Sequence, residues 1–176
     1  RLLTYPRTDS NYITSDMEQT AADLVAALLP ILPYMQDAEF SPEIGRIINN
    51  ARVTDHHAIL PTAEFAKAGF NGLAESEKKL LSLICCKLMC AVAPPHVYEA
   101  VTAVFECGGE QFTAKGKTIL AAGWKGIDAR FRMKLKGKTD EEAEDEATLP
   151  ELAEGQTFDS PATSVSEHYT TPPKPY

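Results

Sequence analysis

The sequence predicts an α+β fold in which a helical domain at residues 1–95 is followed by a β-rich segment at residues 96–176. In the first part, apolar residues recur at the spacing of an amphipathic helix, and prolines interrupt the pattern. In the second part, valine, threonine and aromatic residues alternate with polar ones, which is typical of strands. We place the boundary at Pro94-Pro95, because two prolines cannot continue the helix before them.

Three helices are expected in the helical domain, at residues 15–29, 41–50 and 75–92. The first begins at Ser15, which together with Glu18 fits a capping box. The second begins at Ser41, because the proline that follows occupies the first helical position, where its missing N–H does no harm. The third carries the longest apolar stripe and stops at the two prolines.

Four strands are expected in the β-rich segment, at Val97–Cys107, Gln111–Lys115, Lys117–Ala121 and Gln156–His168. Gly108-Gly109 is a predicted turn after the first strand, and Gly123-Trp124 is expected to begin a loop. Six basic residues follow between positions 125 and 138. They fit either the charged surface of a hairpin or a strip that contacts a nucleic-acid backbone. The first interpretation is preferred, because an acidic run abuts them.

The charge of the chain is unevenly distributed. The formal net charge is −8, which by itself argues against a DNA partner. Eight of the 25 acidic residues lie between positions 139 and 154, where there is no lysine or arginine. The 17 acidic residues elsewhere balance the 17 basic ones, so the acidic block is interpreted as a solvated loop and does not exclude DNA.

Membrane, secretion and nucleotide-hydrolysis functions find no support in the sequence. No apolar run approaches the ~20 residues that span a bilayer, and no charged-then-apolar leader opens the chain. No glycine-rich phosphate loop is present, so no ATP requirement is expected. Free thiols in a reducing cytoplasm are expected for Cys85, Cys86, Cys90 and Cys107. A metal site is disfavoured because the first two are adjacent, whereas zinc ligands are usually spaced by about two to four residues.

The string Tyr5-Pro6-Arg7-Thr8-Asp9-Ser10 is the most informative part of the chain. A tyrosine hydroxyl is a poor nucleophile at neutral pH because its pKa is about 10. It can attack a phosphodiester when a cation stands close and the phosphate is held in line. Arg7 suits this task, since a guanidinium is always charged and binds phosphate oxygens with two parallel hydrogen bonds.

The string resembles the active-site signature of type IA DNA topoisomerases. Residues 55–62, with the sequence DHHAILPT, resemble the second motif of that family. The part from Trp124 to Tyr176 is similar as well, most closely to the topoisomerase III branch, so the resemblance covers nearly the whole chain. It implies a helix-turn-helix-like tyrosine domain followed by part of a β-rich arch. It also implies that the full enzyme cleaves one DNA strand through a 5′-phosphotyrosine intermediate, passes a strand and rejoins the break, which changes DNA topology.

The resemblance assigns roles to individual residues. Tyr5 is the nucleophile, Arg7 positions the scissile phosphate and stabilises its developing charge, and His56 donates to the phosphate. Asp9 is placed among the nucleic-acid contacts and is expected to orient Arg7 rather than to bind a metal, because a lone carboxylate makes a poor magnesium site. Further nucleic-acid contacts are expected from hydroxyls that could alternatively fasten turns and helix starts, namely Thr4, Thr8, Ser10 and Thr62.

The resemblance also implies what the chain lacks. The family holds Mg²⁺ on a separate acidic domain upstream, which also supplies the acid for the leaving 3′ oxygen, so no metal site is expected in this chain. We therefore expect an enzyme fragment that is inactive alone. Its expected partners are single-stranded DNA and the remaining domains of the full-length enzyme, and its expected location is the cytoplasm. An incomplete arch leaves an open strand edge, so self-association of the fragment is expected as well.

Two other classes of protein compete with this interpretation. A non-catalytic DNA-binding module, in which the helices dock on the DNA backbone, is the main alternative. A tyrosine recombinase is a weaker one, because its tyrosine would follow several dispersed arginines and a histidine, whereas here the tyrosine comes first. An upstream Asp-x-Asp cluster with a nearby glutamate would discriminate in favour of the topoisomerase.

Overall fold

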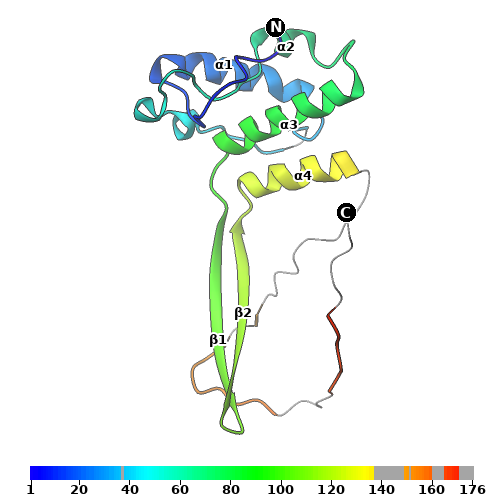
Figure 1. The fold of residues 1–176 in the computed structure, drawn as a ribbon. Coiled ribbons are helices and arrows are strands. Elements are labelled where there is room, and N and C mark those ends of the chain that lie inside the picture. Colours follow the sequence, from blue (N-terminus) through cyan, green and yellow to red (C-terminus); the bar gives the residue numbers. More distant parts are fainter. Residues whose placement is uncertain (37, 137–148, 151, 160–164, 171–176) are drawn as a thin grey trace.

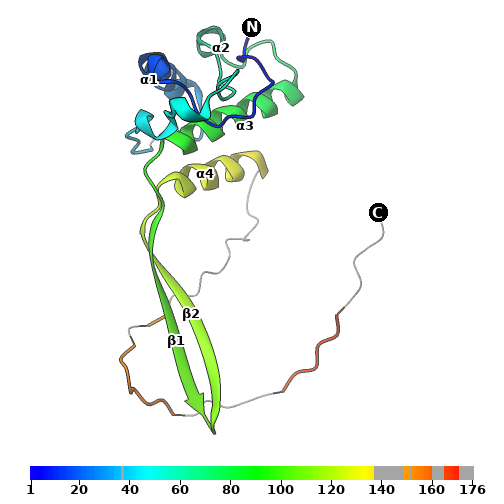
Figure 2. The same cartoon turned by 60° about the vertical axis from the view of Figure 1, so that its left-hand side comes forward.

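A computed structural model describes residues 1–36, 38–136, 149–150, 152–159 and 165–170 (Figure 1). A helical body lies at one end, and a long two-stranded hairpin projects from it (Figures 1 and 2). The α-helices are Glu18–Leu28 (α1), Ala63–Ala68 (α2), Glu75–Val92 (α3) and Trp124–Lys136 (α4), and the strands are Val97–Cys107 (β1) and Glu110–Ala121 (β2). The α+β fold class is therefore confirmed. No helix in the described part of the chain has the length and apolar character needed to cross a membrane.

The first predicted helix is confirmed, but its start differs from the expectation. A 3-10 turn at Ser15–Met17 leads into α1, and a second 3-10 turn at Leu29–Ile31 follows its end. The expected capping box is not formed, because Ser15 pairs with Asn50 instead. The Asn50 side chain accepts from the Ser15 N–H at 2.8 Å and donates to the Ser15 hydroxyl at 3.0 Å. A segment 35 residues away thus holds the start of this helix.

The helix predicted at residues 41–50 is wrong, since two 3-10 turns at Ile44–Ile47 and Asn50–Arg52 take its place. Ile13 pairs with the extended link between these turns. It donates to one backbone carbonyl of the link at 2.8 Å and accepts from one backbone N–H at 3.0 Å. An α-helix would need these backbone groups for its own hydrogen bonds, so tertiary pairing overrides the local helical pattern.

The third predicted helix is confirmed at its predicted bounds as α3. Ala74 precedes it and has no side-chain acceptor, but its N–H donates to the Glu77 carboxylate at 2.9 Å. The helix dipole favours that negative charge in the first turn. The buried residues of α3 are Leu81, Cys85, Cys86, Leu88, Met89 and Val92. Burial raises the pKa of the Cys85 thiol to about 12, as expected for a thiol that belongs to the core.

Helix α4 corrects two expectations. No loop begins at Gly123-Trp124, and the five basic residues between positions 125 and 136 lie on a helix rather than on a hairpin. Lys138, the sixth, lies outside the described residues. Ile127 and Phe131 are buried, and Phe131 meets Tyr34 edge-on with ring centroids 5.3 Å apart. α4 thereby lies along α3 (Figures 1 and 2). The prediction failed because this short apolar stripe is set among charged residues, which leaves the helical period weak in the sequence.

Strands β1 and β2 form an antiparallel hairpin whose register pairs Cys107 with Glu110 at its tip. The predicted turn at Gly108-Gly109 is confirmed, with φ angles of 62° and 85° that glycine adopts without steric cost. The two strands predicted between residues 111 and 121 form one continuous strand. Gly116 did not break it, because this glycine stays paired in the ladder.

The strand predicted at Gln156–His168 is wrong for its described residues, and the rest of that range lies outside the described part. The Gln156 N–H donates to the Ala153 carbonyl at 3.1 Å, and the Gln156 side chain accepts from the Ala153 N–H at 3.1 Å. These bonds close a local turn and occupy groups that a strand would need. Phe158 then meets Phe105 of the hairpin edge-on, with ring centroids 5.7 Å apart.

The segment that leads into the hairpin, Pro94-Pro95, and the segment that leads out of it, Gly123-Trp124, are in close contact at its base. The Trp124 N–H donates to the Pro94 carbonyl at 3.0 Å. Gly123 has a φ of +51°, and a Cβ atom there would lie 2.2 Å from the Pro95 carbonyl oxygen. Only glycine fits this crossing, through which the chain returns from the hairpin to the helical body. The division of the chain into domains at residue 95 stays a prediction.

Candidate active site

The segment before Tyr5 lies beside the end of the second motif, to which it is bridged antiparallel. Thr4 and Leu60 are joined twice. The Thr4 N–H donates to the Leu60 carbonyl at 2.9 Å, and the Leu60 N–H donates to the Thr4 hydroxyl oxygen at 2.9 Å. This pairing brings together two motifs that are far apart in the sequence.

A second group of hydrogen bonds holds the other end of the tyrosine string. Ser10 is only 7% exposed, and its hydroxyl donates to the Arg52 carbonyl at 2.7 Å while accepting from a backbone N–H at 3.0 Å. The Thr8 hydroxyl accepts from the Ser10 N–H at 3.0 Å and lies 3.3 Å from the His56 carbonyl, to which it donates. Both ends of the string are therefore fixed, and residues 5–7 between them are exposed.

The Tyr5 ring is 50% exposed and stacks on the His56 imidazole. The ring centroids are 5.0 Å apart, and the ring planes differ by 24°. The Arg1 guanidinium lies 5.7 Å from the centroid of the same tyrosine ring. The neighbouring His57 instead donates through Nδ1 to the Ala58 carbonyl at 2.7 Å. His56 therefore lies beside Tyr5, and it is also the histidine to which the family resemblance assigns a phosphate contact.

A cleft of about 420 Å³ opens next to this stacked pair. Its lining residues are Arg7, Thr8, Asp9, Asp55 and His56. The cleft offers an anion a guanidinium and an imidazole, and it also contains two carboxylates. Asp55 begins the second motif and lines the cleft, although no role was predicted for it.

The hydroxyls predicted to contact DNA all take part in backbone hydrogen bonds. Thr62 caps α2 by accepting from the Phe65 N–H at 3.3 Å, and it donates to the Arg1 carbonyl at 2.7 Å. These bonds support the alternative that such residues fasten turns and helix starts, and their contact with DNA stays a prediction. Asp9 and Arg7 share the cleft, but no ion pair between them occurs among the described residues.

Comparison with known sequences identifies the class of protein. The family described as DNA topoisomerase matches residues 1–176. The chain therefore belongs to the DNA topoisomerase family, and its resemblance to the type IA enzymes is confirmed.

The individual relatives are more specific. The chain is 36% identical over 178 residues to DNA topoisomerase 3 of Bacillus licheniformis, which covers 98% of this chain and 23% of that protein. It is 36% identical over 180 residues to DNA topoisomerase 3 of Bacillus subtilis, covering 98% of the chain and 24% of the relative. The chain is 34% identical over 180 residues to DNA topoisomerase 3 of Staphylococcus saprophyticus, and the match covers 100% of this chain and 23% of that protein. The chain thus spans about a quarter of the length of the curated relatives it matches.

Proposed function

We propose that the chain carries the catalytic tyrosine of a type IA DNA topoisomerase, an isomerase that cuts and rejoins one DNA strand. The observation that carries the proposal is the exposed Tyr5 ring stacked on His56, beside a cleft that Arg7 also lines. Membership of the family supports it. Because the chain spans about a quarter of its relatives, the complete reaction is assigned to a longer protein of which this chain is one part.

In the proposed reaction a DNA phosphate enters the cleft, and the Tyr5 hydroxyl oxygen attacks phosphorus. A bond forms between phosphorus and the tyrosine oxygen while the bond to the 3′ oxygen breaks. The tyrosine gives up its proton, and the leaving 3′ oxygen takes one up. Arg7 and His56 donate to the non-bridging oxygens, on which negative charge develops. Rejoining is the reverse reaction, and it needs no ATP because the ester bond to tyrosine preserves the energy of the phosphodiester.

Magnesium is implied by the family resemblance but does not fit the described residues of this chain. Mg²⁺ prefers octahedral oxygen ligands, usually from one or two carboxylates together with phosphates and water. Asp9 and Asp55 line the cleft with the cationic Arg7, and neither belongs to a group of three potential ligands among the described residues. We assign magnesium and the acid for the leaving 3′ oxygen to other parts of the longer protein. The 176 residues alone are therefore expected not to relax supercoiled DNA.

Single-stranded DNA is the proposed substrate, because a broken strand must be held and rejoined in an open cleft. The remaining domains of the longer protein are the proposed partners. The relatives come from bacteria, whose DNA lies in the cytoplasm, and the cytoplasm is accordingly the proposed location.

The test compares Tyr5→Phe with the unchanged longer protein in a covalent capture assay on single-stranded DNA. Phenylalanine keeps the ring and removes only the attacking oxygen, so no adduct should survive denaturation. Tyr12→Phe is the matched control, since this half-buried tyrosine of the same segment lies against Arg52 and should not affect capture. An adduct formed by Tyr5→Phe contradicts the assignment. Absence of an adduct from the unchanged protein would favour the non-catalytic DNA-binding module.

A further inference from the structure

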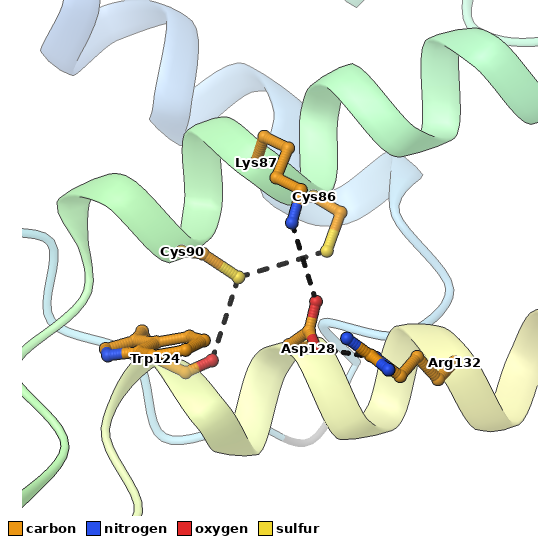
Figure 3. A network of polar contacts seen from close by, with 6 residues as sticks. All are labelled: Cys86, Lys87, Cys90, Trp124, Asp128 and Arg132. Atoms are coloured by element: carbon orange, nitrogen blue, oxygen red, sulfur yellow. Dashed lines mark hydrogen bonds and ion pairs between the residues drawn. The ribbon is translucent and has the colours of Figure 1, made fainter. Parts of the chain in front are cut away.

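The interface between α3 and α4 contains a cluster of side chains that the proposed reaction does not use (Figure 3). Cys86 and Cys90 lie one turn apart on α3, and Asp128 lies opposite them on α4. Both sulfur atoms and a carboxylate oxygen lie within 4.8 Å of one another. Among the described residues, this is the one group of three side chains that could share a metal ion.

We propose that Cys86, Cys90 and Asp128 form a site for one soft divalent cation, Zn²⁺, which joins α4 to α3. The site shares no residue with the cleft beside Tyr5, and its existence does not depend on the proposed DNA cleavage.

The distance between the two sulfur atoms carries the proposal. It is 3.9 Å. Two thiolates at the usual Zn–S distance of about 2.3 Å, bound tetrahedrally, have their sulfurs about 3.8 Å apart. The thiols of α3 therefore stand near the separation that zinc requires. An Asp128 carboxylate oxygen lies within 4.8 Å of both sulfurs, whereas a tetrahedral zinc ion would hold that oxygen about 3.5 Å from each of them.

The sequence spacing is consistent with this geometry. Residues four apart on a helix lie on the same face, and Cys86 and Cys90 are separated by three residues, within the range usual for paired zinc ligands. The adjacency of Cys85 and Cys86 hid this pair, because Cys85 is buried in the core and does not belong to the cluster. Because α3 is a continuous helix, it holds both thiols in place before any metal binds.

Charges around the cluster suit a bound zinc ion. Two thiolates, one carboxylate and Zn²⁺ carry a net charge of −1, after each thiol has released its proton to solvent. Arg132 donates through Nε to one carboxylate oxygen of Asp128 at 2.7 Å, and Lys87 Nζ lies 3.9 Å from the other. These cations offset the charge, and Arg132 orients the carboxylate as outer residues of metal sites do.

The ligand types also select the metal. Two sulfurs with one carboxylate favour zinc, whereas magnesium and calcium take oxygen ligands alone. Three protein side chains leave a fourth tetrahedral position for a water molecule. The Cys90 sulfur also lies 3.7 Å from the main-chain oxygen of Trp124, the first residue of α4 (Figure 3).

The experiment uses the 176-residue chain, prepared without a histidine tag, reduced, and stripped of metal by a chelator that is then removed. Co²⁺ is the optical probe, because thiolate-to-cobalt absorption reports sulfur ligation directly. We expect one Co²⁺ per chain, displaced by one equivalent of Zn²⁺. Zn²⁺ should also raise the melting temperature of the chain, since only the folded state brings all three ligands together.

Four variants assign the ligands. Cys86→Ser and Cys90→Ser should each weaken binding by at least roughly 100-fold, and Asp128→Asn by roughly 10-fold or more. Cys107→Ser is the matched control, because this exposed thiol lies at the tip of the hairpin and its loss should change nothing. Should Cys86→Ser not fold, Cys90→Ser decides, since Cys90 is only half-buried. Absence of thiolate-to-cobalt absorption, or equal affinity in Cys90→Ser, overturns the proposal.

Discussion

Around the tyrosine, buried and exposed residues have different tasks. Thr4 and Ser10 use their hydroxyls to hold the backbone on either side of the string. Their hydrogen bonds hold the backbone that carries the exposed Tyr5 and Arg7, and in-line attack on a phosphate requires such positioning. Stability and chemistry are therefore separable by substitution at this site.

Arg7→Lys tests the chemistry. Lysine keeps the charge but loses the two parallel hydrogen bonds, so single-turnover cleavage by the longer protein should fall by one to a few powers of ten, about 2–4 kcal/mol of transition-state stabilisation. Arg46→Lys is the control, because this exposed arginine pairs with Glu43 and lies outside the cleft. Equal cleavage rates for Arg7→Lys and the unchanged protein would show that Arg7 has a structural role.

Ser10→Ala tests the stability of the same segment. The change leaves the Arg52 carbonyl and a backbone N–H without the hydroxyl that pairs with both. We expect the free energy of unfolding, measured in urea, to fall by about 1–3 kcal/mol. Ser41→Ala, at an exposed position, should stay within about 0.5 kcal/mol of the unchanged chain. A loss no larger than that of Ser41→Ala would mean that Ser10 does not hold the string.

The family signature singled out Tyr5, Arg7 and His56 from the sequence. In the structure Tyr5 stacks on His56, and His56 lines one cleft with Arg7. Their catalytic roles stay predictions. The buried Ser10 hydroxyl donates to the Arg52 carbonyl, which is distant in sequence, so no local pattern could reveal this role of Ser10. The cluster of Cys86 and Cys90 with Asp128 depends likewise on where α4 packs against α3.

Among the elements, local patterns were reliable where local contacts decide the structure. Helix α3 and the glycine turn of the hairpin formed as predicted. Residues 41–50 failed because Ile13 takes backbone groups that a helix would need. Helix α4 was missed because its two buried residues stand among basic ones.

Gly123→Ala tests the crossing at the base of the hairpin. The new Cβ would lie 2.2 Å from a backbone oxygen, which cannot move as a side chain could, and the positive φ adds strain. We expect a loss of at least about 1–3 kcal/mol in the free energy of unfolding. Gly45→Ala is the matched control, since nothing lies within 4 Å of its Cβ position and its φ is not positive. Equal stability of the two variants would show that the crossing is not a fixed contact.

In the described part of the chain, the hairpin exposes many large apolar side chains. They are between 39% and 64% exposed, namely Val97, Tyr98, Val101, Val104, Phe112, Ile119 and Leu120. Among the described residues no third strand pairs with either edge. A two-stranded hairpin is marginally stable in water by itself, so this surface needs a partner.

We therefore expect the isolated chain to self-associate through the hairpin, or to cover it by refolding a loop. Light scattering over a concentration series should show a rising mean mass. Val104→Lys should lower that association, whereas Thr118→Lys, at an exposed polar position of the same hairpin, should have less effect. A strictly monomeric chain whose hairpin amides exchange freely with solvent would contradict both forms of the expectation.

Tyr5 is proposed to become covalently linked to DNA. This link can be tested by trapping the longer protein on a single-stranded oligonucleotide, digesting the adduct with a protease, and locating the attached nucleotide by tandem mass spectrometry. We expect one modified residue, Tyr5, joined to a 5′ phosphate and leaving a free 3′ hydroxyl on the other fragment. A nucleotide on any other residue, or a link through a 3′ phosphate, would contradict it.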